Sequence, residues 1–346
     1  MTNETEFLKV IENNLTEVSK KYGDERRTNI ENISEEAPII EEKVIIAYIS
    51  KRGAIIAKEM SSMATQKRGT VGSKIKFADR NDYIWKTIVG KNTEQVLIFT
   101  NLGKSYNLQL SAMPLSEETY INQLLPLKTN EYVTNILSYD NAKNYKYVVF
   151  ATRNGTVKKT DIKEYLNGAR KTGLIALKLR DDDVLISTKL ITEENDCIIF
   201  ATKKGNCLVI NQKDVSTTAR NTIGVKGINL AADDQLIAMD IITKNTEEVL
   251  SVSAKGYAKR TSIEEFSSAT RATKGNLICK FKEENDYLAD MVLLNKNHKE
   301  IIVNSKLSSL KITADSIPVQ NRATIGVQTI KVTNNNLVND LILLEN

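Results

Sequence analysis

Adjacent cations beside glycines form the pattern in this sequence that points most clearly to a chemistry. The stretch 66–72 reads QKRGTVG, in which Lys67 and Arg68 are followed by Gly69 and Gly72. Two neighbouring cations favour a phosphate group, and glycines let the backbone approach a ligand closely. The alternative is a glycine-containing loop between two strands, which related copies of the pattern further along the chain support.

Further cations recur at or just after turns that the sequence predicts about every fifty residues. They occupy equivalent points of a repeat, so we expect them to form a ring on one rim of the fold. Such a ring can follow a phosphate backbone without reading bases, although lysine is also common in solvated turns. This set comprises Lys51, Arg52, Lys58, Lys104, Arg153, Lys158, Lys159, Lys203, Lys204, Lys255, Lys259 and Arg260.

The sequence contains no set of residues at a spacing typical of a catalytic site or a metal site. Its one histidine, His298, lies in a polar run and is expected to be a solvated loop residue. The three cysteines include no CxxC pair and are expected to be reduced thiols in strands or the core. Two acidic clusters, 181–183 and 233–234, fall at the same point of their repeats and predict turns between strands. No P-loop or dinucleotide motif is present, so we expect no cofactor, metal or catalytic residue.

Composition indicates a globular chain whose main part is basic. The 346 residues are 41% hydrophobic, and no apolar run approaches the roughly 20 residues that span a bilayer. The polar, acidic start lacks the features of a signal peptide, so a cytoplasmic protein is expected. Residues 1–43 carry 6 basic and 11 acidic side chains, whereas residues 44–346 carry 42 and 32. The positive charge of the larger part favours a polyanionic partner.

Six similar segments, spaced 50 to 52 residues apart, must position these cations. Each has an apolar run, then Ser or Thr, two residues and Gly, and then a second β-prone run. β-Branched and aromatic residues favour strands, and the glycine supplies the positive φ of a tight hairpin. The last copy has Ser in place of the glycine, so its turn needs another geometry or carries strain. The Ser/Thr and Gly positions are Ser50/Gly53, Thr100/Gly103, Thr152/Gly155, Thr202/Gly205, Ser253/Gly256 and Ser305/Ser308.

A second motif, an Arg with a Gly three or four residues later, follows these turns by about eighteen residues. It occurs as Arg68/Gly72, Arg170/Gly173, Arg220/Gly224, Arg271/Gly275 and Arg322/Gly326, and the second repeat has Tyr120, Ile121 and Asn122 near the expected place. A strand-like stretch and a final apolar run come after each motif, so each unit has about four strands. Six such units predict an all-β, six-bladed, propeller-like closed array over residues 44–346, rather than an open solenoid.

Residues 1–43 lie outside the repeat. Apolar residues at helical spacing predict a short amphipathic helix over residues 4–22, with Gly23 as its stop. The Glu-rich residues 30–43 are expected to form an acidic linker. The apolar face of the helix needs a partner, which could be a second copy or a domain that this chain lacks.

Two stretches and the repeat pattern resemble the C-terminal part of the bacterial DNA gyrase A subunit. QKRGTVG is similar to the gyrase A box, QRRGGKG, and residues 21–28 (KYGDERRT) closely resemble the stretch that precedes the six-bladed β-pinwheel of that family. The resemblance covers essentially the whole chain. It implies a module that wraps double-stranded DNA around a basic perimeter and so supports ATP-dependent supercoiling. By position, the box residues would be Gln66, Lys67, Arg68, Gly69 and Gly72.

The same resemblance implies that Lys67 and Arg68 contact phosphates, whereas Thr70 and Val71 depart from the Gly and Lys of the family's box. The topoisomerase IV A subunit, whose related domain has a degraded or absent box, is the nearest alternative. The family's cleavage tyrosine lies in a winged-helix domain and its ATPase in a partner protein, and nothing in this chain matches either. We therefore expect no catalysis from this chain, and two partners, the gyrase B subunit, which holds the ATPase, and the catalytic core of the gyrase A subunit. The helix at the start would be the tail of a coiled-coil arm.

The favoured hypothesis is a non-catalytic, nucleoid-associated DNA-binding module. Its DNA-binding residues would be the box, the turn cations and the arginines of the second motif, Arg170, Arg220, Arg271 and Arg322. A propeller that binds proteins and not DNA is an alternative from another class. A hydrolase or lyase on a propeller would need clustered acids or histidines, which this sequence does not offer.

Overall fold

The computed structural model describes residues 2–24, 41–115, 117–166, 172–192 and 196–345. The chain divides into two compact units, Met1–Glu41 and Glu42–Asn346. Residues 30–40 of the expected linker and residues 25–28 of the stretch 21–28 lie outside the described residues.

The first unit is the helix α1 (Thr2–Tyr22), which confirms the helix expected from the apolar spacing. Its last turn carries Lys20 and Lys21, whose charges complement the negative end of the helix dipole. The Gly23 N–H donates to the Ser19 carbonyl oxygen at 2.8 Å, where the helix ends. The apolar side chains that predicted the helix are all exposed: Phe7, Leu8, Ile11, Leu15 and Val18.

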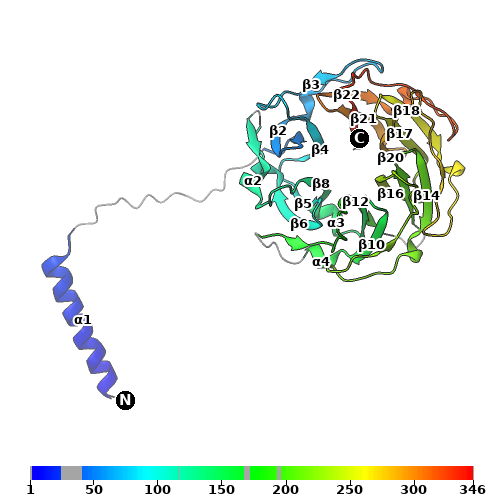
Figure 1. The fold of residues 1–346 in the computed structure, drawn as a ribbon. Coiled ribbons are helices and arrows are strands. Elements are labelled where there is room, and N and C mark those ends of the chain that lie inside the picture. Colours follow the sequence, from blue (N-terminus) through cyan, green and yellow to red (C-terminus); the bar gives the residue numbers. More distant parts are fainter. Residues whose placement is uncertain (1, 25–40, 116, 167–171, 193–195, 346) are drawn as a thin grey trace. The chain divides into compact units, whose positions relative to one another are not determined.

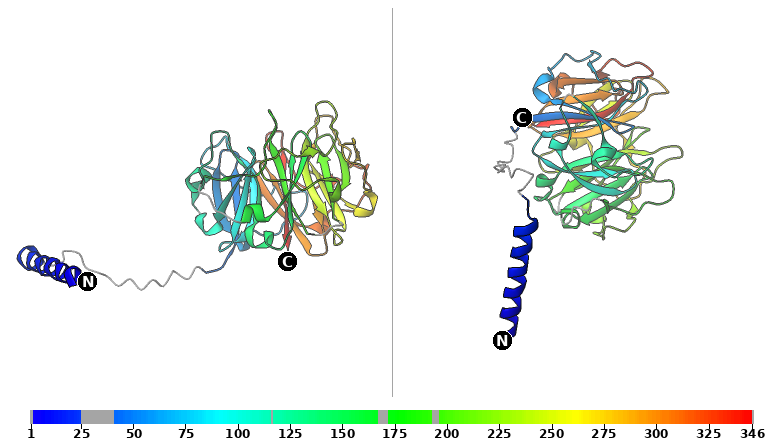
Figure 2. Two further views of the ribbon diagram at one scale, coloured as in Figure 1. Left: turned by 90° about the horizontal axis from the view of Figure 1, so that it is seen from below. Right: turned by 90° about the vertical axis from the view of Figure 1, so that its left-hand side faces the viewer.

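The second unit consists of six four-stranded antiparallel sheets arranged as blades around a centre, which confirms the expected six-bladed array (Figure 1). The strands run roughly along the axis of the ring (Figure 2). The six innermost strands contact one another in sequence and close the ring, with β24 against β4. They are β4 (Ile84–Lys91), β8 (Val133–Ser138), β12 (Leu185–Ile191), β16 (Leu236–Ile242), β20 (Leu288–Leu294) and β24 (Val338–Glu345).

The second and third strands of each blade form the hairpins that the repeated Ser/Thr-x-x-Gly pattern predicts. The second strands are β1 (Val44–Ser50), β5 (Gln95–Thr100), β9 (Tyr147–Thr152), β13 (Cys197–Thr202), β17 (Glu248–Ser253) and β21 (His298–Ser305). The third strands are β2 (Ala54–Glu59), β6 (Lys104–Gln109), β10 (Thr156–Asp161), β14 (Asn206–Asn211), β18 (Tyr257–Ser262) and β22 (Ser308–Thr313). His298 therefore starts a strand and is half-buried, which corrects its assignment to a solvated loop.

A one-turn helix follows each of the six third strands, and two more one-turn helices occur in the second repeat. They are η1 (Met60–Ser62), η2 (Leu110–Ala112), α2 (Ile121–Leu124), α3 (Tyr139–Ala142), α4 (Lys163–Leu166), η3 (Gln212–Asp214), η4 (Ile263–Glu265) and η5 (Ala314–Ser316). Among the described residues, no helix is both long and apolar enough to cross a membrane.

The outermost strand of each blade comes from the following repeat. The sheet orders are β4-β1-β2-β7, β11-β6-β5-β8, β12-β9-β10-β15, β16-β13-β14-β19, β20-β17-β18-β23 and β24-β21-β22-β3. The outermost strands are β7 (Glu118–Tyr120), β11 (Leu174–Ile175), β15 (Val225–Lys226), β19 (Asn276–Leu277), β23 (Val327–Gln328) and β3 (Ser73–Lys74). Four strands per repeat is correct as a count, but a blade and a repeat are not the same unit.

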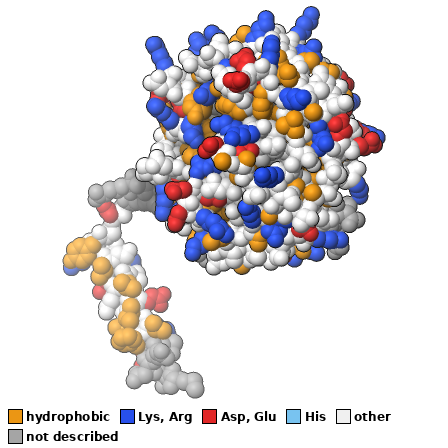
Figure 3. Space-filling model, turned by 45° about the vertical axis from the view of Figure 1, so that its right-hand side comes forward, with side chains coloured by type: hydrophobic (Ala, Val, Ile, Leu, Met, Phe, Trp, Pro, Cys, Tyr) orange, Lys and Arg blue, Asp and Glu red, His pale blue; other side chains and the backbone are white. Residues whose placement is uncertain are grey.

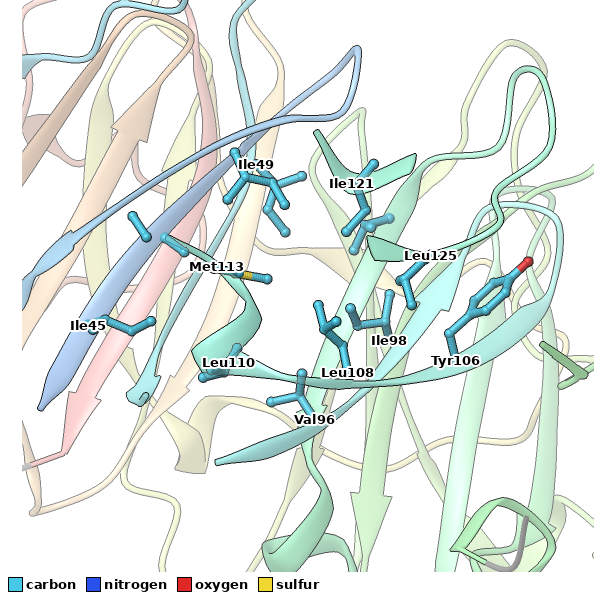
Figure 4. Packing of buried hydrophobic residues seen from close by; sticks show 14 residues of the cluster. Ile45, Ile49, Val96, Ile98, Tyr106, Leu108, Leu110, Met113, Ile121 and Leu125 are labelled. Carbon is cyan, nitrogen blue, oxygen red and sulfur yellow. The ribbon is translucent and has the colours of Figure 1, made fainter. Parts of the chain in front are cut away.

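The hydrophobic core lies in six wedges between neighbouring blades. In the wedge between the first two blades, Ile45 and Ile49 of β1 face Val96 and Ile98 of β5 (Figure 4). Leu97 of β5 instead belongs to the next wedge, because successive side chains of a strand point to opposite faces. The second strands are therefore buried on both faces, which explains why the sequence shows them as unbroken apolar runs.

Candidate nucleic-acid interface

Each hairpin turn is tied to an acidic or amide side chain about thirty residues further along the chain. In the third blade, Thr152 Oγ1 donates to Asp183 Oδ2 at 2.6 Å, and the Asn154 N–H donates to Asp183 Oδ1 at 3.0 Å. In the second blade, Thr100 Oγ1 likewise donates to Glu131 at 2.7 Å. The acidic clusters thus lie at turns, as predicted, but the hydroxyl–carboxylate pairing was missed. The signal was there, since an Asp, Glu or Asn recurs 31 to 33 residues after each Ser/Thr.

The last turn, which lacks the glycine, uses another geometry. The Ser308 backbone is outside the left-handed region that the glycines of the other five turns occupy. Ser308 Oγ lies 2.7 Å from Ser305 Oγ and 2.8 Å from the carbonyl oxygen of Val71, to which it donates. The hydroxyl that replaces the glycine therefore connects the last hairpin to the stretch 66–72.

The stretch 66–72, called the box loop below, lies on the outside of the sixth blade. The Gln66 N–H donates to the Lys311 carbonyl oxygen at 2.8 Å, and the Gly69 N–H to that of Thr329 at 2.6 Å. Arg68 Nη1 donates to the Ser316 carbonyl oxygen at 2.6 Å. Because these residues belong to the first repeat, an arrangement with one repeat per blade would place them on the first blade. The exchange of outer strands moves it to the last blade.

Thr70 belongs to a pattern that this chain repeats, Arg-x-Thr-x-Gly. Its hydroxyl donates to the carbonyl oxygen three residues earlier, Lys67, at 3.1 Å. Thr222, Thr273 and Thr324 make the same bond at 2.9, 3.0 and 2.8 Å. The residue that departs from the family's box therefore closes the loop in this protein, and it does so in four blades.

The four Arg-x-Thr-x-Gly loops, 68–72, 220–224, 271–275 and 322–326, are here called the perimeter loops. Each threonine carbonyl accepts a backbone N–H from the stretch that follows the preceding outermost strand. The bonds are Lys178 N to Thr222 O, Asn229 N to Thr273 O, Lys280 N to Thr324 O and Lys331 N to Thr70 O, at 2.9 to 3.0 Å. A continuous hydrogen-bonded edge thus runs along the outside of these blades and ends at the box loop.

The predicted DNA-binding cations have three different surroundings. Lys67, Arg68, Arg52 and Lys204 are exposed, and Lys67 is held by no partner among the described residues. Half-buried side chains are those of Lys51, Lys104, Arg153, Lys203, Arg220, Arg260, Arg271 and Arg322. Lys158, Lys159 and Lys259 are buried. Arg170 lies outside the described residues.

The three buried lysines are not surface cations, which corrects the expectation that they form part of a basic rim. Lys158 Nζ donates to the carbonyl oxygens of Ala176 and Arg220 at 2.9 and 2.7 Å. Lys259 Nζ donates to those of Asn321 and Arg322 in the equivalent place. Burial lowers the pKa of both lysines to about 8. Their ammonium groups hold perimeter loops in place, because those loops leave backbone carbonyls that need donors.

Several arginines are already paired with carboxylates. Arg260 Nη1 lies 3.0 Å from Glu248 and 3.1 Å from Asp315, and Arg52 pairs with Asp79. The carboxylates of Glu164 and Glu265 accept the backbone N–H groups of Arg220 and Arg322 at 3.0 Å. These carboxylates lower the local positive potential at the loops 220–224 and 322–326, whereas neither Arg68 nor Arg271 forms an ion pair with a carboxylate among the described residues.

The turn cations and the perimeter loops do not form one surface. The N–H groups of Lys51, Arg153 and Lys203 donate to carbonyls just before the innermost strands, at Tyr83, Val184 and Gln235. Arg153 and Lys203 line a cavity at the end of the central channel that is nearest the turns. Arg153 and Lys203 therefore lie at this end of the channel and not at the outer edge, where the perimeter loops are.

Exposed cations on and after the outermost strands were missed by the sequence analysis. They share a place, within about ten residues after the Arg–Gly motif, and alternate with residues that point inward. They are Lys74, Lys76, Arg80, Lys178, Arg180, Lys226, Lys280, Lys282 and Lys331. On the visible face of this unit, Lys and Arg side chains are widely distributed and Asp and Glu form small groups (Figure 3). The perimeter is thus a surface that can bind a phosphate backbone at many points.

Comparisons with known proteins agree with this architecture. The family model for the DNA gyrase C-terminal domain, β-propeller, matches residues 146–192, 198–243, 247–295 and 309–345. The chain is 31% identical to the DNA gyrase A subunit of Lawsonia intracellularis (strain PHE/MN1-00), over 93% of this chain and 40% of that protein. It is 29% identical to the DNA gyrase A subunit of Escherichia coli (strain K12), over 90% of this chain and 36% of that protein. The chain thus spans well under half the length of these relatives.

Two solved structures share the fold. The structure of DNA gyrase A C-terminal domain aligns with a TM-score of 0.78 and 22% identity, over 87% of this chain and 99% of that one. The C-terminal domain of DNA topoisomerase IV aligns with a TM-score of 0.66 and 22% identity, over 89% of this chain and 95% of that one. At these identities the likeness concerns the fold alone. The family model covers more than half of the chain, so this chain belongs to the DNA gyrase C-terminal domain, β-propeller family.

Proposed function

We propose that the six-bladed unit binds double-stranded DNA along its perimeter and bends it. The observation that carries this proposal is the box loop, where the exposed Lys67 and Arg68 stand on the hydrogen-bonded edge formed by the perimeter loops. Exposed lysines on the neighbouring outermost strands extend the positive surface along that edge. Cations spaced along a curved edge contact successive phosphates only if the duplex bends to follow them.

The proposed role is that of a DNA-wrapping part of a type IIA topoisomerase of the gyrase kind, with topoisomerase IV as the alternative parent. The unit would have no catalytic activity of its own. DNA cleavage would be supplied by the catalytic core of the gyrase A subunit, and ATP hydrolysis by the gyrase B subunit. The unit would work in the cytoplasm, on the nucleoid.

Ring closure of short DNA duplexes by a ligase, with the protein bound, tests this function. The wild-type chain is expected to change the yield and topology of the circles, because bending brings the duplex ends together. Replacing both Lys67 and Arg68 by Ala should reduce that change more than it reduces affinity, since the other perimeter cations remain. Affinity should fall steeply with salt concentration in a gel-shift series, because cation–phosphate contacts release counterions.

The matched control is the double variant Arg52→Ala, Lys204→Ala, which removes the same charge from exposed residues at the turn end of the blades. It should leave DNA bending close to that of the wild type. An equal loss of bending in both double variants would mean that net charge, and not the position of Lys67 and Arg68, determines bending. No binding at low salt would overturn DNA as the partner and favour a protein-binding propeller.

A further inference from the structure

The turn-side end of the central channel holds a cavity of about 360 Å³, here called the mouth, and we propose that it binds a nucleoside phosphate. The base would lie against an aromatic wall formed by Trp85 and Tyr132, and the phosphate against Arg153 and Lys203. This site goes beyond the perimeter interface, because it lies at the centre of the ring and takes an unpaired base.

The aromatic wall comes from the first two blades. Trp85 of β4 and Tyr132, just before β8, meet edge to face with ring centroids 5.3 Å apart. Trp85 Nε1 donates to the Val133 carbonyl oxygen at 2.8 Å, which holds the indole in place. The Lys51 ammonium lies 3.5 and 3.0 Å from the centroids of Trp85 and Tyr132 and lines a neighbouring cavity, whereas the two aromatic residues line the mouth. Such rings are sequence-tolerant stacking surfaces for bases.

The cationic wall comes from the third and fourth blades. Lys203 Nζ lies 4.6 Å from the centroid of Tyr287, a third aromatic ring of the mouth. The Arg153 guanidinium donates to the Asp182 carbonyl oxygen, which leaves its other N–H groups for a ligand. Neither side chain forms an ion pair with a carboxylate among the described residues. Two cations beside aromatic rings favour an anion that is attached to a planar group.

Asn339 also lines the mouth, and only one of its two polar side-chain atoms has a hydrogen-bond partner among the described residues. Asn339 Nδ2 donates to the Ile84 carbonyl oxygen at 2.5 Å, while Asn339 Oδ1 is buried and accepts no hydrogen bond from any described residue. A buried acceptor of this kind is unfavourable unless a ligand or water donates to it. Because this oxygen is shielded from the cavity, ligand recognition depends on the aromatic and cationic walls.

The aromatic and cationic walls together favour a nucleoside phosphate over other ligand classes. An acidic peptide would use the cations and leave the aromatic wall without a stacking partner. An apolar ligand would leave Arg153 and Lys203 without an anionic partner. The nucleoside phosphate could come from a free nucleotide or from a single DNA strand, and both present the same base and phosphate.

Tryptophan fluorescence reads this site directly, because Trp85 is the one tryptophan of the chain. Adenosine monophosphate and oligo(dT) are each titrated into the whole protein, with Trp85 excited at the red edge of its band. Saturable quenching is the expected result. Quenching by both probes would show that a free nucleotide is enough to occupy the mouth. Quenching by oligo(dT) alone would show that the ligand is a single DNA strand.

Two neighbouring lysines provide the matched variants. Lys203→Ala, which removes a cation from the mouth, should weaken binding roughly fivefold, as for one partly screened ion pair. Lys204→Ala removes the same charge next to it but outside the mouth, and should change binding less than about twofold. The Lys67→Ala, Arg68→Ala double variant should keep the quenching, which separates this site from the DNA interface of the perimeter.

Three results would overturn the proposal. The first is quenching by neither probe, or quenching that rises linearly without saturation. The second is an equal effect of Lys203→Ala and Lys204→Ala. The third is saturable quenching by duplex DNA that the perimeter variant abolishes, because the mouth would then be part of the duplex interface. In each variant, far-ultraviolet circular dichroism and the unfolding midpoint check that the ring is intact.

Discussion

Lys74 is the β-ladder partner of Ser308, so a strand from the first repeat completes the blade formed by the last repeat. The same seam is bridged at the centre of the ring, where Lys86 Nζ lies 2.9 Å from Asp340 Oδ1. The two ends of the six-bladed unit are therefore held together both at the perimeter and at the channel. A radial array gains from this, since closure leaves fewer exposed edges than an open sheet would.

Two glycines of the box loop should differ in their effect on this seam. Both have a φ of about +80°, but a Cβ at Gly72 would meet the Ser309 carbonyl oxygen at 2.7 Å, whereas at Gly69 it would meet nothing within 4 Å. Gly72→Ala should therefore lower the free energy of unfolding by about 3 kcal/mol and Gly69→Ala by about 1 kcal/mol. Urea unfolding measures both. Equal losses would mean that the seam tolerates a side chain at Gly72.

The turn of the third blade should depend on Asp183. Asp183→Ala leaves the Thr152 hydroxyl and the backbone N–H groups of Asn154 and Val184 without their acceptor, at a cost of about 3 kcal/mol of unfolding free energy. Thr152→Val should cost about 1 kcal/mol, and the double variant little more than Asp183→Ala. Thermal or urea unfolding of the four proteins completes the cycle. Asp181→Ala, at an exposed neighbour, is the control and should change little.

Asp290, which lies beside the central channel, should make the stability of the protein depend on pH. Burial raises the pKa of Asp290 from 3.8 to about 6, although Asp290 Oδ2 accepts the Leu341 N–H at 2.9 Å. Because the folded protein then binds more protons than the unfolded chain between about pH 4 and 6, this group lowers stability as pH rises through that window. Asp290→Asn should flatten the dependence and be about 1 kcal/mol more stable at pH 8.

The control is Asp340→Asn in the same channel. It leaves the Lys86 ammonium without its 2.9 Å partner and should cost about 3 kcal/mol at pH 8. Unfolding midpoints across pH 4 to 8 compare the variants. An unchanged pH slope in Asp290→Asn would show that another group titrates in this window.

Trp85 should report the protonation of Lys51. Burial lowers the pKa of Lys51 to about 8, and its ammonium lies 3.5 Å from the centroid of the indole. The fluorescence of Trp85 should therefore change with a midpoint near pH 8, and Lys51→Met should abolish that step. Because the folded-state pKa lies below the ordinary value of 10.5, this group makes stability rise between about pH 8 and 10.5. Lys203→Met should keep the fluorescence step, since Lys203 lies over Tyr287 instead.

Local features of the fold could be predicted because short stretches of sequence determine them. Apolar runs such as 148–151 predicted the second strands, and the glycine of each turn predicted the hairpins. Apolar spacing predicted a helix over residues 4–22, and α1 spans Thr2–Tyr22 with its apolar side chains exposed. These features depend on side-chain periodicity and on the φ preference of glycine, which need no knowledge of distant neighbours.

The roles of individual cations could not be predicted from the same repeat. Lys158 and Lys203 both lie near turns in the sequence, yet Lys158 is buried under a perimeter loop and Lys203 stands at the mouth. Lys226, which sequence reasoning missed, is exposed on an outermost strand. The exposure of each lysine depends on its neighbours from the next blade. Lys158 binds the backbone carbonyl oxygen of Arg220, and Lys203 lies beside the ring of Tyr287.

The sequence by itself determined the six repeats, their hairpins and the positive charge of residues 44–346. These features depend only on the local order of side chains and on composition. The tertiary structure decided where one blade ends and the next begins. Outer strands pair with the preceding blade, because glycines of the perimeter loops let two backbones come close together there. A Cβ at Gly72, Gly224, Gly275 or Gly326 would lie 2.1 to 2.7 Å from a backbone carbonyl oxygen of that blade. That long-range pairing moved the box loop from the first repeat to the sixth blade and separated the turn cations from the perimeter.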